Sequence, residues 1–361
     1  MGDGGSRHRA VPNGLPGRPG VSPGRPSGLP GQHGPLQDRF GRIHRSLRIS
    51  VTDACNIRCQ YCMPADGVTF LARDRHLGFG HIGRFVEVMA SSGLERLRLT
   101  GGEPLLRPGL DRLVARLAAI PAVREVALTT NGMLLADRMA DLARAGLRRV
   151  NISLDTLSEE TFRKLSRREG LDRVLRGIDA VLACPTVGLR LNALILRDVN
   201  LGDVLGLVGF ARERRITLRF IEFMPLDANR DWSRDRMVSG DELRQIIAER
   251  YGGLRPADVT DASQPARDYL LPGGGRVGFI DTVTRPFCGA CDRLRLTSDG
   301  KLRNCLFGQE EWDVGRLLRR GGDAAEIERT VRDCLAAKHP RHGIAEAGFR
   351  PPPRAMYQIG G

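Results

Sequence analysis

The sequence of 361 residues is poor in lysine, in aromatic residues and in long apolar runs, and the last two deficits each argue against a class of protein. No apolar run is long enough to cross a bilayer, and the sequence does not open on a secretory signal. Aromatic residues make up only 5% of the chain, with neither helix-turn-helix punctuation nor an aromatic-rich strand on which RNA bases could stack. These absences predict a cytoplasmic protein that does not bind a membrane, and the scarcity of aromatic residues argues against nucleic acid as a partner.

The charge is strongly positive, with 56 lysine and arginine residues against 42 aspartate and glutamate residues, a formal net charge of +14. Arginine supplies nearly all of this excess. A basic balance of this size indicates a polyanionic partner. Nucleic acid is one candidate, but a phosphorylated small molecule fits the composition as well.

Eight cysteines are present, and six of them stand in two groups. In a chain without an export signal, such grouping favours metal ligation in a reducing compartment over a disulfide framework. The first group, Cys55, Cys59 and Cys62, forms a CxxxCxxC motif directly after a strand-like run. Three thiolates can hold three irons of a cubane [4Fe-4S] cluster and leave the fourth iron open, whereas a zinc knuckle needs another ligand.

The second group consists of Cys288, Cys291 and Cys305. Two interpretations stay open for it: a zinc site completed by His339 or His342, or a second [4Fe-4S] cluster whose open iron binds substrate. The segment between these cysteines reads Asp292-Arg293-Leu294-Arg295-Leu296-Thr297, where strand alternation places both arginines on one face. Two guanidinium forks beside an iron suit a phosphate or a purine edge, although solvated surface arginines are the plainer alternative.

The chain divides into three parts by composition and periodicity. Residues 1–35 contain ten glycines and seven prolines, so residues 1–39 are predicted to be a disordered Gly/Pro/Arg-rich tail. Residues 40–225 alternate strand-like and helical runs and predict an α/β fold, a partial (βα)6 barrel of the TIM type. Residues 226–361 break this rhythm and predict an α+β lid that carries the second cysteine group.

The expected elements can be given by residue range. The predicted strands are 47–51, 95–99, 124–129, 148–153, 188–195 and 216–223, and the predicted helices between them are 80–92, 109–119, 134–145, 170–183 and 201–213. The C-terminal part is predicted to hold helices near 239–251, 311–320 and 323–337, with a hairpin around 273–275. Because polar residues follow all six strands, the site is expected at their carboxyl ends.

With the cysteine motif followed one strand later by Thr100-Gly101-Gly102-Glu103-Pro104, the sequence resembles the radical S-adenosylmethionine superfamily. The resemblance implies that S-adenosylmethionine caps the open iron of the first cluster. It further implies that one electron splits this cofactor to give a 5'-deoxyadenosyl radical, and that the GGE motif binds the amino end of the cofactor.

Further motifs narrow the resemblance to one family. The runs LRISVTD at 47–53, CxxxCxYCMP, RLTGGEPL at 98–105, IEFMP at 221–225 and CxxCxRLRLTxDGxLxxCLF are similar to those of the GTP 3',8-cyclases, a lyase family that begins molybdenum cofactor biosynthesis. The similarity covers residue 40 to the terminal Gly360-Gly361. It implies that the radical removes hydrogen from C3' of GTP, that the ribose radical attacks C8 of guanine, and that a second [4Fe-4S] cluster anchors the guanine.

The resemblance also assigns residues. It places Tyr61, Gly102, Ser153 and Met224 on S-adenosylmethionine, and Arg48, Arg98, Thr129, Arg190, Arg293, Leu294 and Arg295 on the GTP side. Both cysteine groups become cluster ligands, and no further catalytic residue is assigned. Implied partners are GTP, a reductase or flavodoxin-type electron donor, a downstream cyclic pyranopterin monophosphate synthase and a second copy of the chain.

Two positions depart from the family pattern, since Arg190 replaces a usual lysine and Ala54 a frequent arginine. Two other functions remain as alternatives. A peptide-modifying radical S-adenosylmethionine enzyme also carries auxiliary clusters, but it uses more C-terminal cysteines than are present here. A cluster-containing nucleic-acid-binding protein would account for the charge but not for the GGE motif.

Overall fold

The computed structural model describes residues 1–2, 34–259 and 261–361. The predicted disordered tail, residues 1–39, therefore lies largely outside the described residues. Its last part is packed, because Leu36 is fully buried in the main core and Asp38 is buried beside Arg42. Among the described residues, no helix has both the length and the apolar composition needed to span a bilayer.

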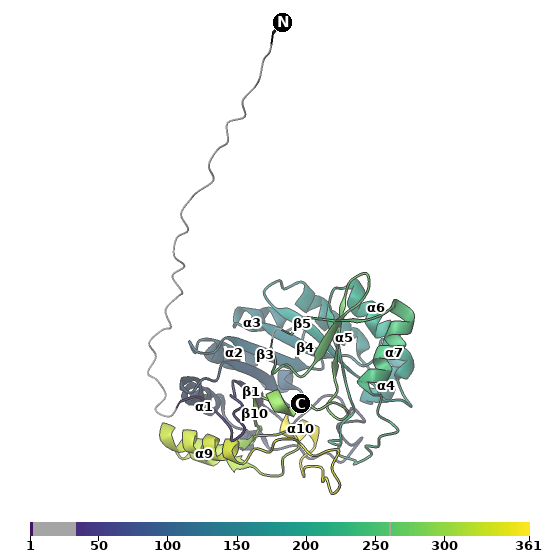
Figure 1. Cartoon of the computed structure of the whole chain (residues 1–361). Coiled ribbons are helices and arrows are strands. Elements are labelled where there is room, and N and C mark those ends of the chain that lie inside the picture. The colour runs from purple at the N-terminus through teal and green to yellow at the C-terminus, as the bar shows by residue number, and fades with distance from the viewer. Residues whose placement is uncertain (3–33, 260) are drawn as a thin grey trace.

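The described strands form one sheet in the order β12-β11-β10-β1-β2-β3-β4-β5-β6-β9-β8-β7. The strands from β10 through β1–β6 to β9 are parallel to their neighbours, and the outer strands at both ends are antiparallel. Figure 1 shows the helices that follow β1–β6 on the outer side of this curved sheet, whereas the chain end lies beside β1 and β10. The mixed α/β class predicted from the sequence is confirmed.

All six predicted strands and five predicted helices of residues 40–225 are present. The strands are β1 (Ser46–Ser50), β2 (Arg96–Thr100), β3 (Glu125–Thr130), β4 (Arg149–Ser153), β5 (Gly188–Leu194) and β6 (Thr217–Ile221). The helices are α1 (Phe79–Ser91), α2 (Leu110–Ala118), α3 (Met139–Arg144), α4 (Glu159–Ser166), α5 (Leu171–Leu182) and α6 (Val204–Glu213). Helix α4 was not predicted. Helix α3 begins later than predicted, because residues 132–138 form successive turns, with Leu135 N donating to Gly132 O and Arg138 N to Leu135 O.

Strand alternation separates the core from the inner face of the sheet. In β2, Leu97 and Leu99 are buried in the main hydrophobic core, while Arg96, Arg98 and Thr100 alternate with them and line the inner cavity. The neighbouring strands are in register, so that Arg48 lies between Arg98 on one side and Arg295 on the other. The inner face is consequently a set of polar rows supported by an apolar outer face.

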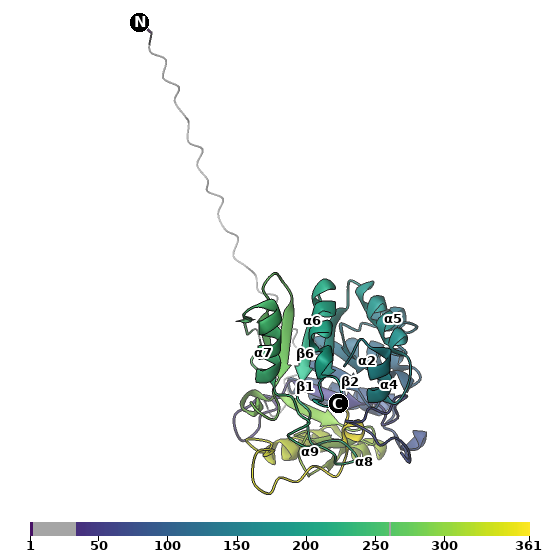
Figure 2. The ribbon, with the colours of Figure 1, turned by 90° about the vertical axis from the view of Figure 1, so that its right-hand side faces the viewer.

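The C-terminal part extends the same sheet at both ends. Its strands are β7 (Arg255–Pro256), β8 (Arg267–Leu270), β9 (Arg276–Ile280), β10 (Arg293–Leu296), β11 (Lys301–Arg303) and β12 (Trp312–Asp313). Its helices are α7 (Gly240–Tyr251), α8 (Val314–Arg319), α9 (Ala324–Ala336) and α10 (Met356–Ile359). The β8–β9 pair is the hairpin predicted around 273–275. In Figure 2, α8 and α9 lie at one end of the sheet and α6 and α7 at the other.

The strands β9 and β10 pair with β6 and β1, so the boundary predicted at residues 225 and 226 falls within one continuous sheet. Helix α8 begins later than predicted because Asp313 ends β12 and caps the helix, its carboxylate accepting from Arg316 N at 2.9 Å.

Candidate active site

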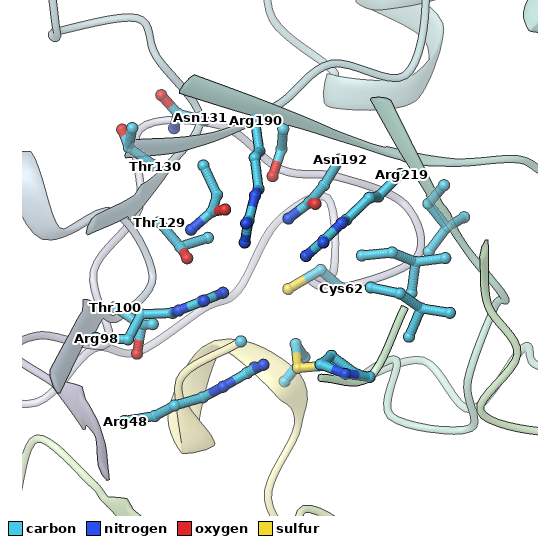
Figure 3. A pocket seen from close by; sticks show the side chains of 18 of the residues that line it. Arg48, Cys62, Arg98, Thr100, Thr129, Thr130, Asn131, Arg190, Asn192 and Arg219 are labelled. Carbon is cyan, nitrogen blue, oxygen red and sulfur yellow. The ribbon is translucent and has the colours of Figure 1, made fainter. Parts of the chain in front are cut away.

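The inner face of the sheet encloses a cavity of about 440 Å³. Side chains from β1 through β6 line it, and the three thiols of the first cysteine group stand on its wall. The view in Figure 3 shows four arginines that reach into this space from β1, β2, β5 and β6: Arg48, Arg98, Arg190 and Arg219.

The first cysteine loop is fixed by buried hydrogen bonds on two sides. The Asp53 carboxylate accepts from Leu71 N at 2.8 Å and lies 3.0 Å from His76 Nε2. On the other side, Arg58 N donates to Ser166 O at 2.8 Å, which joins the loop to the end of α4. The unpredicted helix α4 is thus part of the support of the cysteine loop.

The glycines of the GGE motif pack directly on the same loop. A Cβ atom on Gly101 would lie 2.5 Å from Thr52 O, and one on Gly102 would lie 2.4 Å from Ala54 O. Only glycine allows this approach. The carboxylate of Glu103 is fully buried and accepts from Leu105 N, Asn131 N and Thr130 Oγ1, so it joins β2 to the end of β3.

The thiols of the first group are neutral unless a metal displaces their protons. Burial raises the pKa of Cys55 to about 11 and that of Cys62 to about 12, and it raises the pKa of Cys59 as well. A metal that binds thiolate releases the proton and offsets this cost of burial. Three such thiols on the wall of a polar cavity fit an iron–sulfur cluster open toward that cavity.

The residues predicted to contact S-adenosylmethionine, Tyr61, Gly102, Ser153 and Met224, all line the cavity. Tyr61 donates its hydroxyl hydrogen to Asp155 Oδ2 at 2.5 Å, and Asp155 Oδ1 accepts from Leu194 N. Burial raises the pKa of Asp155 to about 6. Asp155 was not predicted as a site residue, although it follows directly after the polar end of β4.

On the substrate side, the predicted residues Arg48, Arg98, Thr129 and Arg190 also line the cavity. Burial, followed by the charges of neighbouring arginines, lowers the pKa of Arg48, Arg98 and Arg190. Among the described residues, no hydrogen-bonded carboxylate offsets this for any of the three. Thr129 Oγ1 is buried without a hydrogen-bond partner in the described structure. These groups could hold an anion, because a bound phosphate would supply the missing negative charge.

Three further arginines line the cavity, but each is paired with acids. Arg96 is bound by Asp261 and Asp292, and Arg149 is bound by Glu125. Arg219 lies 3.0 Å from Asp268. The sequence prediction omitted all three, although strand alternation could have found them, because every second residue of a parallel strand faces the cavity.

The second cysteine group does not itself line the cavity, but Arg293 and Leu306, its neighbours in sequence, do. Burial alone would raise the pKa of Cys291, but the charges of Arg293 and Lys338 and hydrogen bonds from Arg293 lower it to about 6. In the described chain, no three Cys, His, Asp or Glu side chains converge as ligands of a single metal ion would. A cubane does not need this convergence, since each thiolate binds a different iron.

The two histidines considered as zinc ligands have other environments. His339 is exposed, and its carbonyl accepts from Arg42. His342 Nε2 lies 2.9 Å from Thr282 O, and the His342 ring packs against Phe307. Neither side chain reaches the second cysteine group through a hydrogen bond given by the structure.

Two of the residues predicted on the GTP side, Leu294 and Arg295, have side chains that are engaged elsewhere in the protein. The side chain of Leu294 points into the main core, so only its backbone is available to a ligand. Arg295 is buried and donates to Gly360 O at 2.7 Å, while Gly361 lines the cavity. The chain end thus forms part of the cavity wall.

A parallel sheet with an inner cavity, a CxxxCxxC loop and a glycine pair packed on that loop define a radical S-adenosylmethionine protein. Residues 49–211 match the Radical SAM superfamily, and residues 216–344 match Molybdenum Cofactor Synthesis C. The structure is similar to that of Streptococcus suis SuiB bound to precursor peptide SuiA, with a TM-score of 0.61 and 14% identity over 85% of this chain and 67% of that chain. This likeness concerns the fold alone.

Relatives with a higher sequence identity than this solved structure show to which family the chain belongs. The chain is 48% identical to a GTP 3',8-cyclase of Rhodopirellula baltica over 90% of this chain and 92% of the relative. It is 41% identical to a GTP 3',8-cyclase of Streptomyces coelicolor over 90% of this chain and 96% of that relative. The chain belongs to the GTP 3',8-cyclase family. Membership implies S-adenosylmethionine and [4Fe-4S] chemistry, which the first cysteine group and the cavity fit.

Proposed function

We propose that this protein converts GTP into (8S)-3',8-cyclo-7,8-dihydroguanosine 5'-triphosphate, the first step of molybdenum cofactor biosynthesis. One observation carries the proposal: a single cavity joins the CxxxCxxC thiols to three half-buried arginines that have no hydrogen-bonded carboxylate among the described residues. The thiols suit a radical-generating cluster, and the arginines suit a triphosphate.

The proposed architecture is a partial (βα)6 barrel made by β1–β6, with residues 226–361 as a lid that carries the second cluster. The sequential order of the parallel strands and the helices on their outer side support the barrel. The position of α10 and Gly361 at the cavity supports the assignment of the C-terminal part as its cover.

The two cysteine groups are proposed to hold two [4Fe-4S] clusters. When bound, the first cluster and S-adenosylmethionine supply an organic radical able to remove a hydrogen atom from an unactivated carbon. Tyr61, Gly102, Ser153 and Met224 would hold this cofactor in place, and the Tyr61–Asp155 hydrogen bond would fix the aromatic ring beside it. The electron would come from a reductase or flavodoxin-type donor, and the product would pass to a cyclic pyranopterin monophosphate synthase.

The arginines of the inner face are proposed to orient the substrate. Arg48, Arg98 and Arg190 would bind the triphosphate, because their guanidinium groups share one space and lack hydrogen-bonded carboxylates (Figure 3). Arg293, which stands on the cavity wall two residues after Cys291, would direct the guanine toward the second cysteine group. The fork of Arg190 would bind two phosphate oxygens where a lysine would offer a single point charge.

The proposed activity is tested by anaerobic incubation of the reconstituted protein with S-adenosylmethionine, dithionite and GTP. We expect 5'-deoxyadenosine to form together with the cyclised nucleotide, in amounts that rise when GTP is added. ATP serves as the matched control, because it carries the same triphosphate on a different base. Formation of 5'-deoxyadenosine that is indifferent to GTP, with no cyclised product, would contradict the proposal.

The anion site leads to a prediction for Arg98. Its replacement by methionine removes one charge-assisted hydrogen bond in a buried pocket, which contributes on the order of 1.5–3 kcal/mol. We therefore expect Arg98→Met to weaken GTP binding by roughly ten- to a hundredfold without loss of iron, as measured by calorimetry and iron analysis. Arg176→Met is the control, because Arg176 is exposed and pairs with Asp172 on α5. Equal affinity in both variants would remove Arg98 from the substrate site.

A further inference from the structure

The chain has three lysines, and one of them, Lys338, is buried directly behind the second cysteine group. Lys338 follows the end of α9 and is only 3% exposed. Its ammonium group lies 2.9 Å from His44 Nε2, 3.1 Å from Arg293 O and 3.5 Å from Cys291 Sγ. These three acceptors match the three hydrogens of the ammonium group.

The contact with His44 fixes which way the hydrogen bond runs. His44 Nδ1 lies 3.0 Å from Arg42 O, and a carbonyl oxygen can only accept. The hydrogen of the neutral imidazole is therefore on Nδ1, and Nε2 presents a lone pair to Lys338. Because His44 is fully buried, its ring holds the ammonium group in one position.

The segment around His44 also contacts the other end of the second group. The guanidinium of Arg42 is anchored on Asp38 and donates to Cys288 O at 2.8 Å and to His339 O at 2.9 Å. Residues 38–44 therefore support both the Cys288 backbone and the ammonium that contacts Cys291. Residues 38–44 and Lys338 together form a wall behind the second cysteine group. The polar groups of this wall are buried and have hydrogen-bond partners, so the wall is preorganised.

None of the three partners of Lys338 is a carboxylate. A buried ammonium without a counter-ion is costly. The Asp38 carboxylate lies 3.7 Å from His44 Nε2 but is bound by Arg42 at 2.6 Å, and among the three direct partners of Lys338 only the Cys291 sulfur can carry a full negative charge. We propose that Lys338 is the built-in counter-ion of the Cys291 thiolate and that it raises the reduction potential of the second cluster. The inference rests on the proposed second cluster.

The expected effect follows from charge. Reduction adds one electron to the cluster and no proton, so a fixed positive charge beside one ligand stabilises the reduced form more than the oxidised form. Hydrogen bonds to cluster sulfurs are among the factors that set such potentials. Removing the charge of Lys338 should lower the equilibrium constant for reduction of the second cluster by about tenfold. For a one-electron reduction this corresponds to a shift of ~59 mV to lower potential.

The test compares variants of the full-length chain in which Cys55, Cys59 and Cys62 are alanine, so that only the second cluster gives an electron paramagnetic resonance signal. The parent of this series must first hold about four irons, since a parent without iron would mean that the second cluster itself is absent. Midpoint potentials are then measured by dithionite titration for Lys338→Met, Lys338→Gln and Lys338→Arg. Lys164→Met is the matched control, because Lys164 is exposed on α4.

We expect lower potentials for Lys338→Met and Lys338→Gln, and the parental value for Lys338→Arg and for the Lys164 control. If Lys338→Met does not retain iron, the test relies on the midpoint potentials of Lys338→Gln and Lys338→Arg, of which only the first should be lower than that of the parent. Parental potentials in both neutral variants would overturn the proposal. Loss of the cluster in all three Lys338 variants would also overturn it, because the lysine would then act through its shape and not its charge.

Discussion

A variant in which Cys288, Cys291 and Cys305 are all alanine is expected to hold about four irons per chain instead of about eight and to lose cyclisation of GTP. The two cysteine groups are separate in the structure, since the first lines the cavity wall and the second stands next to β10 and β11. Loss of the second group should therefore leave the first cluster intact. Iron analysis and product detection on anaerobically reconstituted protein measure both effects.

The matched control for this variant is Cys184→Ala combined with Cys334→Ala, which removes the two cysteines that belong to neither group. Cys334 is fully buried in the main core, and Cys184 packs at its edge. The control should hold the full iron content. Stoichiometric zinc in the native protein, with iron unaffected by the triple change, would replace the second cluster by a zinc site.

Substitution of Gly360 by alanine is expected to reduce the turnover of GTP by roughly a hundredfold, since displacement of a site by about 1 Å can have an effect of that size. A Cβ atom at this position would lie 2.7 Å from Thr100 Oγ1 and 2.8 Å from the Cβ atom of Ser50. The chain end would have to leave its place beside β1 and β2, and the contact of Gly360 O with Arg295 would be lost. Steady-state kinetics under anaerobic conditions measure the effect.

Gly348→Ala is the control, because Gly348 has nearly the same backbone angle, with φ of 87° against 90° at Gly360. A Cβ atom at Gly348 would meet nothing within 4 Å. Both variants place an alanine at a similar positive φ, and the clear difference between them is the crowding of the Cβ atom at the cavity. Equal turnover in the two variants, at full iron content, would mean that the chain end is not part of the active site.

The strands and the cavity-facing residues were largely predictable because both follow from a period of two. Leu47, Leu97 and Leu99 mark the face of the sheet that packs on the core. The arginines that alternate with these leucines must therefore lie on the opposite face, toward the cavity. Glycine at 101 and 102 was a local signal as well, since no other residue tolerates the observed approach to the cysteine loop.

Other features depend on partners far away in the sequence and could not be predicted. Arg96 and Arg98 share a face of β2, yet only the first is paired, because Asp261 and Asp292 arrive from distant segments. Helix α4 begins with a Ser158 cap, which is visible in the sequence. The contact of α4 with the cysteine loop depends on the tertiary structure and is not visible there. Leu294 is a further case: the resemblance assigns this residue to the GTP side, and only the structure shows that its side chain lies in the core, which leaves its backbone for a ligand.

The pairing of β1 with β10 has a consequence for synthesis of the chain. One edge of β1 stays open from the time residue 50 emerges until residues 293–296 are made. At ribosomal speeds of about 5–20 residues per second, this interval lasts on the order of ten seconds to a minute. An unpaired parallel strand exposed for that time invites association with other chains. Slow translation of the C-terminal part would prolong this exposure.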